Sequence, residues 1–291
     1  MAAQRPVRLS ISSRTVVEAA RSLRLLGAAA GSAAKLVAHL CNSGMSADDL
    51  SLRIESDPVL CARVLRVANA AYYGQQRSVT TIRRALLVLG LNTVRGVAAA
   101  ACIEQAIPSR LAALPDPAAL GRHGLATALA AEMLAMGEIP EMATEAFIAG
   151  LLHNLGVVIQ SQVDPDGMAQ MIAARRAGDT RDIRTLEEEH AAISHGQAAS
   201  IVFEEWKLPA AFIAAAEHHH DSSAAPESAR PLTDIVSRAA RLALACGQVY
   251  SLEPTCPVTG PDGPLESTQL GPAAFRDELS RRLEHLTTAL A

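Results

Sequence analysis

The stretch AFIAGLLHNLG, residues 146–156, decides how the rest of the sequence is interpreted. Its apolar residues recur every three to four positions, as Phe147 and Leu151 do, which predicts a deeply buried helix. His153 and Asn154 place two polar side chains inside that apolar run, and buried polar groups need partners. The stretch therefore predicts either a ligand site or an internal hydrogen-bond network within a helical core.

The composition favours an all-α fold. Hydrophobic residues make up 49% of the 291-residue chain but aromatic residues only 3%, so the core is built from aliphatic side chains, and alanine and leucine are strong helix formers. Asp57-Pro58 and Asp116-Pro117 each combine a capping residue with a proline at the first helical position. No run of alternating polar and apolar residues predicts a strand.

Charge is distributed unevenly along the chain. Residues 1–110 carry 14 Lys and Arg against 6 Asp and Glu, a net charge of +8, whereas residues 111–291 carry a net −12. Charges scattered over solvated helix faces explain this best. The basic part could also dock on the acidic part or on a polyanion. No nucleic-acid-binding motif is present, so nucleic acid is not an expected partner.

Cysteine usage and hydropathy indicate a cytoplasmic protein. None of the five cysteines forms a C-x-x-C pair, which is typical of reduced thiols. The N-terminal residues show no apolar leader segment. The most apolar stretch, residues 85–103, is interrupted by Asn92 and Arg95, so no membrane association is expected.

Histidines recur on successive predicted helices. His123, His153, His195 and the pair His218-His219 each fall on or at the end of a different helix. Imidazole is the commonest metal ligand in proteins, and rings from several rigid helices can surround one cation. His220 is expected at the surface, as is His190, which follows three glutamates.

Several segments, in this order, resemble one family. They are DPVLCARVLRVAN (57–69), ALLVLG (85–90), GRH (121–123), AFIAGLLHNLG (146–156), ISHG (193–196), WKLP (206–209) and EHH (217–219). Together they resemble the HDOD family, an HD-related output domain of bacterial signalling proteins within the HD/HD-GYP phosphohydrolase superfamily. The resemblance covers residues 22–222.

The resemblance implies a two-lobed helical bundle. We expect an N-terminal lobe over 22–112 and an HD-like lobe over 113–250. A stretch rich in Pro, Gly, Ser and Thr, residues 251–271, is expected to be a linker to a C-terminal helix over 272–291. That helix has an apolar stripe of Phe275, Leu279, Leu283, Leu286 and Leu290. The stripe is expected to dock on the body of the same chain, and a homodimer seam is the alternative.

The resemblance also implies a regulatory role without demonstrated hydrolase activity. HD enzymes carry Asp where this chain has Asn154, and residues 235–241, where the distal Asp of those enzymes falls, contain no carboxylate. Asp234 is near, but one turn or more away. We therefore expect a non-catalytic module that binds a protein or a ligand, with proteins of two-component or cyclic-dinucleotide pathways as partners. The alternative is a metal-dependent phosphohydrolase acting on a cyclic dinucleotide or nucleotide.

The candidate site is a vestigial metal site. Its members are His123, His153, Asn154, His195, His218 and His219. A hydrogen-bonded buried network is the preferred interpretation, with no cofactor, because an amide is a poor metal ligand. A divalent ion such as iron or manganese is expected if the histidine cluster is intact.

Overall fold

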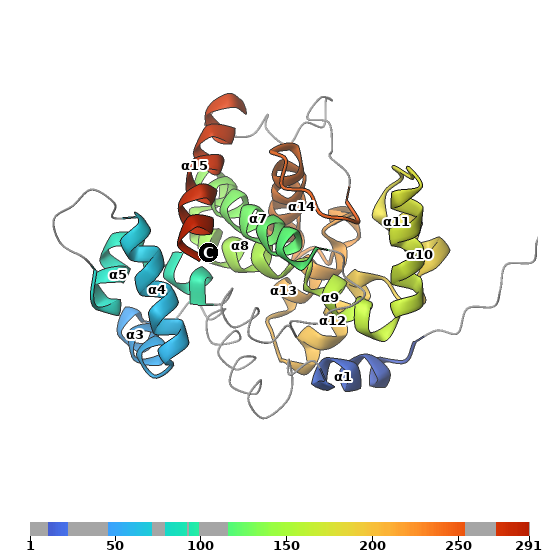
Figure 1. The fold of residues 1–291 in the computed structure, drawn as a ribbon, viewed down its shortest axis with the longest axis horizontal. Helices are drawn as coiled ribbons and strands as arrows, with labels where there is room; N and C mark the ends of the chain where they lie inside the picture. Colours follow the sequence, from blue (N-terminus) through green and yellow to red (C-terminus); the bar gives the residue numbers. More distant parts are fainter. Residues whose placement is uncertain are drawn as a thin grey trace, which may run out of the picture.

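The computed structural model describes most of the chain. The described residues are 11–22, 46–71, 79–91, 93–98, 116–253 and 272–290. They are predominantly helical, and the only β-bridge among them pairs Tyr250 with Glu253. The all-α prediction is confirmed for this part of the chain (Figure 1).

The elements follow one another with short connections. Their bounds are α1 Ser13–Ser22, α3 Ala47–Glu55, α4 Pro58–Ala71, α5 Ile82–Leu89, α7 Pro117–Glu138, η1 Pro140–Met142, α8 Ala143–Leu152, α9 Leu155–Val163, α10 Pro165–Arg176, α11 Ile183–His190, α12 His195–Glu205, α13 Ala210–His218, η2 Ser222–Ala224, α14 Arg230–Ala245 and α15 Pro272–Leu290. Residues 93–98 are also helical.

Helices α3, α4 and α5 pack together at one end of the molecule (Figure 1). Local sequence sets their ends: Ser46 caps α3 by accepting from the Asp49 amide, and Thr81 caps α5. The side chain of Asn69 bonds both the amide and the carbonyl of Val79, at 2.7 and 2.8 Å. Asn69 therefore ties α4 to the segment that leads into α5.

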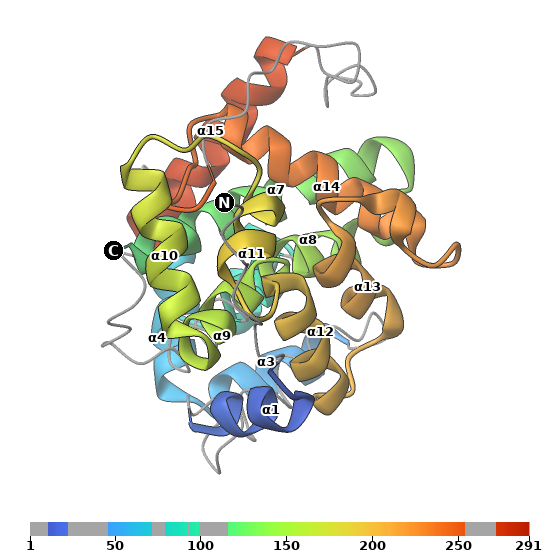
Figure 2. The ribbon, with the colours of Figure 1, turned by 90° about the vertical axis from the view of Figure 1, so that its right-hand side faces the viewer.

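Helices α7 to α14 form the other, larger part, with α7, α8 and α14 in close mutual contact and α12 between α9 and α13 (Figure 2). Helix α1 packs on α9 and α12, so this part also includes a segment from before residue 22. The two parts meet where helical residues 93–98 contact α8, because a Cβ on Gly96 would overlap the ring of Phe147.

The deciding stretch is not one continuous helix. Helix α8 ends at Leu152 and α9 begins at Leu155, with His153 and Asn154 between them. The ring Nδ1 of His153 lies 2.6 Å from the carbonyl oxygen of Gly150, the acceptor that the Asn154 amide would use in an uninterrupted helix. The prediction of a single helix here was wrong because a side chain competes for the backbone acceptor.

Helix α15 joins the two parts by packing on α4 and α7. Phe275, Leu279 and Leu283 are buried against the same chain, and Arg282 lies 3.6 Å from Glu132 of α7. The side chains of Leu286 and Leu290, and most of the predicted linker 251–271, lie outside the described residues. The apolar residues of this stripe that the structure describes are therefore buried by docking of α15 on its own chain.

One run, Pro140–Val163, is long and apolar enough by composition to cross a membrane. In the fold, 78% of its apolar window is buried inside the molecule. Its composition is that of core elements, η1 to α9, which other helices enclose.

Candidate functional site

Five histidine rings converge where α7, α8, α12 and α13 meet. His123 lies within α7, His153 follows α8, His195 begins α12, and His219 and His220 follow α13. Consecutive ring centroids lie 5.3 Å apart for His123 and His153, 4.9 Å for His153 and His219, and 5.1 Å for His219 and His195. We call His123 and His153 the inner pair, and His195, His219 and His220 the outer group.

Glycines allow the helices to approach closely enough for the rings to meet. A Cβ on Gly150 would lie 2.9 Å from backbone atoms of α7. A Cβ on Gly156 would lie 1.8 Å from the carbonyl oxygen of His195, and one on Gly196 would lie 2.7 Å from the Glu217 carbonyl oxygen. Real Cβ atoms do not approach so closely, so these helix contacts require glycine.

Backbone carbonyls orient three of the rings through Nδ1. The pairs are His123 with Gln248 (2.8 Å), His153 with Gly150 (2.6 Å) and His219 with Ala216 (2.9 Å). A carbonyl oxygen only accepts hydrogen bonds, so Nδ1 carries the hydrogen in each ring. The lone pair is therefore on Nε2, the atom left to bind a cation.

Three Nε2 atoms of the cluster lack a hydrogen-bond partner among the described residues. Those of His123, His153 and His220 are buried and make no hydrogen bond in the described part of the chain. A buried acceptor without a partner costs on the order of 1–3 kcal/mol. The donor set therefore fits a cation better than a closed internal network.

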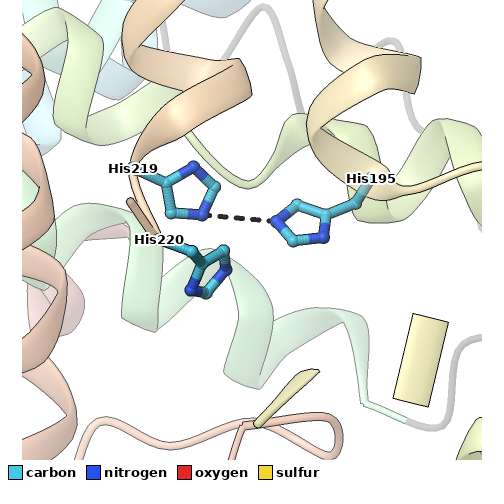
Figure 3. A group of neighbouring side chains, drawn as sticks. All are labelled: His195, His219 and His220. Carbon is cyan, nitrogen blue, oxygen red and sulfur yellow. Dashed lines mark hydrogen bonds between the residues drawn. The ribbon is translucent and has the colours of Figure 1, made fainter. Parts of the chain in front are cut away.

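The outer group has the geometry of a metal site. The ligand atoms of His195, His219 and His220 all lie within 4.8 Å of one another, and the three rings come from the facing ends of α12 and α13 (Figure 3). Nitrogen ligands of this type suit zinc, iron, nickel and copper. These three histidines could hold a metal ion.

Glu187 supports the outer group from behind. One carboxylate oxygen, Oε1, accepts from the His195 amide (2.7 Å), from His195 Nδ1 (2.7 Å) and from Gln160 Nε2 (2.8 Å). A carboxylate that holds the far nitrogen of a ligating histidine fixes its ring and raises its basicity. Burial alone would lower the pKa of His195, but the charge and hydrogen bond of Glu187 outweigh it and raise that pKa.

The other rings are neutral. Burial lowers the pKa of His123 to about 4, and burial together with neighbouring histidines holds the pKa values of His153, His219 and His220 well below 6.5. The 3.3 Å contact between Nε2 of His195 and Nε2 of His219 requires one donor, which is His195 because His219 has its hydrogen on Nδ1. In this arrangement a proton lies between two atoms that would bind a metal, and metal binding would release it.

Asn154 is buried beside the cluster and donates to the Tyr250 hydroxyl at 3.3 Å. Its neighbour in space is a carboxylate that sequence analysis missed. Glu253 is buried, with Oε2 3.7 Å from His123 Nε2 and Oε1 3.5 Å from His220 Nε2. Burial raises the pKa of Glu253 to about 7. Glu253 falls in the stretch expected to be a linker, where no local pattern marks it as part of a site.

Two histidines lie elsewhere than the sequence suggested. His218, a predicted site residue, is not one of the three histidines whose ligand atoms converge, although it lines the same pocket as His195 and His220. His220, expected at the surface, belongs to the outer group. Adjacent residues at a helix end point in different directions, and sequence spacing did not resolve which of the three consecutive histidines faces inward.

Asp234, considered from sequence, and Asp221, which follows the three consecutive histidines, have other partners. Asp234 lies 3.3 Å from Arg238, and Asp221 accepts from Ser223 and lies 3.8 Å from Arg184. Asp221 lines the pocket with His195 and His220, and among the described residues neither carboxylate belongs to the group of convergent ligand atoms.

A pocket of about 440 Å³ connects the outer group to solvent. His195 and His220 lie at its inner end, and α11, α12 and the end of α13 form its walls. Charged residues at its mouth are Arg184, Glu188, Glu217 and Asp221.

Comparison with known proteins identifies the family. The family model described as the HDOD domain matches residues 26–222. An uncharacterized protein of Treponema pallidum (strain Nichols) is 24% identical over 202 residues, which are 67% of this chain but 38% of that protein. The chain thus spans well under half the length of this relative.

Solved structures share the fold. A candidate phosphohydrolase from Shewanella amazonensis SB2B superposes with a TM-score of 0.68 at 22% identity, covering 95% of this chain and 98% of that one. An HDOD domain protein of unknown function from Geobacter sulfurreducens gives 0.68 at 19% identity, covering 96% and 98%. A candidate signal transduction protein from Marinobacter aquaeolei VT8 gives 0.69 at 22%, covering 89% and 58%. At these identities the likeness concerns the fold alone, and it is the family match over most of the chain that shows that this protein belongs to the HDOD domain family.

Proposed function

We propose that this chain is a regulatory HDOD module that binds one divalent transition-metal ion at the outer group and does not hydrolyse phosphate esters. The observation that carries the proposal is the arrangement of His195, His219 and His220, whose ligand atoms lie within 4.8 Å of one another. His195 and His219 are also oriented through their Nδ1 atoms, so metal binding requires little reorganisation.

The chemistry of the site favours binding over hydrolysis. A bound divalent ion in a hydrolase supplies Lewis acidity and an activated water, and paired ions are held by anionic oxygens that bridge them. Asn154 offers an uncharged amide at the position where HD enzymes have Asp, and this amide is already engaged with Tyr250. The chain's own residues therefore hold and orient an ion but lack the bridging carboxylate of the HD motif.

The pocket mouth also disfavours a phosphate substrate. Glu188, Glu217 and Asp221 outnumber Arg184, and that arginine lies within 4.0 Å of Asp182 and Asp221. A mouth with this charge attracts cations and repels phosphate anions. It gives a metal ion access to the outer group while opposing entry of a nucleotide or cyclic dinucleotide.

As a regulatory module the chain would act through a protein partner. We infer that the partner is a bacterial signalling protein, in keeping with the family and with a fold shared by a candidate signal transduction protein. Helix α15, which bridges the two parts, would couple changes at the site to α4. A homodimer through α15 is the alternative.

The test combines metal analysis with an activity assay. Protein purified without chelators should contain about one transition-metal ion per chain, and its thermal midpoint should fall when a chelator removes the ion. The same protein, loaded with manganese, iron or zinc, should show no turnover of cyclic dinucleotides, nucleotides or bis(p-nitrophenyl) phosphate. Metal content well below one per chain, with no binding on titration, would contradict the metal site, and rapid metal-dependent turnover would establish the phosphohydrolase alternative.

A further inference from the structure

Glu253 is a buried carboxylate beside the histidine cluster, near His123 and His220. It reaches the cluster from the short segment after α14, where Tyr250 and Glu253 form a β-bridge. The segment is anchored from outside by Arg175, whose Nε and Nη2 donate to the Leu252 carbonyl at 2.9 and 2.7 Å. The position of Glu253 is therefore set by the fold and not by an exposed loop.

The carboxylate lies between the two halves of the cluster. Oε2 is 3.7 Å from His123 Nε2 and Oε1 is 3.5 Å from His220 Nε2, both beyond hydrogen-bond length. Neither nitrogen has a hydrogen-bond partner in the described residues. His123 Nε2 carries the lone pair of its ring, so this nitrogen and the carboxylate face each other without a hydrogen atom from the ring between them.

Two pairwise separations are close to that of neighbouring ligands on one ion, but Glu253 is not among the residues whose ligand atoms all lie within 4.8 Å of one another, so it would have to move towards the outer group to bind the same ion. Two ligands at 2.0–2.1 Å from a tetrahedral ion lie about 3.4 Å apart. The distance from His195 Nε2 to His219 Nε2 is 3.3 Å, and that from His220 Nε2 to Glu253 Oε1 is 3.5 Å. Burying a divalent charge among imidazole rings is costly without an anion, and the fold places Glu253 beside His220 in addition to Glu187 behind His195.

We propose that Glu253 supplies the anionic ligand of the metal centre, replacing the charge that Asn154 does not carry. Tyr250 and Asn154 are positioning residues that bond its carboxylate. The inference rests on the proposed function, because it requires that the outer group binds a metal ion. Glu253 lies beyond the segments that resemble the family, so the inference adds the segment after α14 to the site.

The experiment compares Glu253→Gln with Asp234→Asn by zinc titration calorimetry and by cobalt(II) absorption spectroscopy. Both variants remove one negative charge, but Asp234 is half exposed and pairs with Arg238. Glu253→Gln should weaken zinc binding at least 10-fold and change the visible cobalt bands, whereas Asp234→Asn should leave affinity within about twofold. Equal effects in the two variants, or an unchanged Glu253→Gln titration, would overturn the inference.

Failure of the inference and failure of the proposed function give different results. If the wild-type chain binds no zinc, the proposed function fails. If the wild type binds zinc and Glu253→Gln binds it equally well, only the role of Glu253 fails. Should Glu253→Gln not fold, a crystal structure of the zinc-loaded wild type decides: a Glu253 oxygen at about 2.0–2.2 Å from the ion supports the inference, and a longer separation refutes it.

Discussion

The inner pair and the outer group consist of the same residue type, yet their surroundings differ. His123 and His153 are fully buried, and backbone carbonyls alone orient them. In the outer group, Glu187 binds His195, and a pocket reaches His195 and His220. Among the described residues, the outer group combines a carboxylate behind one of its rings with a pocket that reaches two of them, and the inner pair has only backbone carbonyls behind its rings.

The largest expected difference in zinc affinity is between a variant that removes a ring of the outer group and one that removes a ring of the inner pair. His219→Gln should lower zinc affinity by more than about 100-fold, because it deletes a ligand, whereas His123→Gln should lower it by less than 10-fold. Calorimetric titration of both variants, with circular dichroism as a check on folding, measures the difference. A larger loss for His123→Gln would assign the metal to the inner pair and reverse the comparison.

The next effect concerns the carboxylate that distinguishes the outer group. Glu187→Gln should weaken zinc binding by about 10–100-fold, because the amide no longer raises the basicity of His195. Glu188→Gln, one residue away at the exposed pocket mouth, removes the same charge and serves as the control. Competition with a chromogenic chelator gives both affinities. Similar losses in the two variants would mean that long-range charge, and not the hydrogen bond, matters.

The close contact between α9 and the start of α12, where Gly156 meets His195, can be tested with a single methyl group. Gly156→Ala places a Cβ against the His195 carbonyl oxygen and should destabilise the fold by about 1–3 kcal/mol. Gly121→Ala, where a Cβ meets nothing within 4 Å on helix α7, should instead stabilise it by about 0.5–1 kcal/mol. Urea unfolding measures both changes. A neutral Gly156→Ala would show that α9 and α12 shift apart easily.

The smallest effect on zinc affinity is expected at Tyr250, beside the inner pair. Tyr250→Phe removes the hydroxyl that accepts from Asn154 and should cost about 0.5–1.5 kcal/mol in the free energy of unfolding. Zinc affinity should change by only a few-fold, because Tyr250 positions Glu253 without being a ligand. Denaturant titration with and without zinc separates the two quantities. A loss of affinity as large as that of Glu253→Gln would place Tyr250 among the ligands.

Local signals in the sequence predicted much of this fold. The Asp116-Pro117 signal gives the start of α7, and Ser194 caps α12 with Gln197 completing a capping box. Capping depends on residues a few positions apart, so it is visible in the chain. The histidines on α7, α8 and α12 were also candidates from spacing alone. What spacing could not give was the rotation of each helix end, which separates His218 from His219 and His220.

The sequence by itself determined that the chain is helical, that it belongs with HDOD proteins, and that His153 and Asn154 interrupt a buried apolar run. These properties follow from composition, periodicity and residue order. Only the tertiary structure decided that His220 joins the cluster and that Glu253, 99 positions after Asn154, brings a carboxylate to it. Contacts between segments so far apart depend on how α13, α14 and their connections pack, and no local pattern encodes that packing.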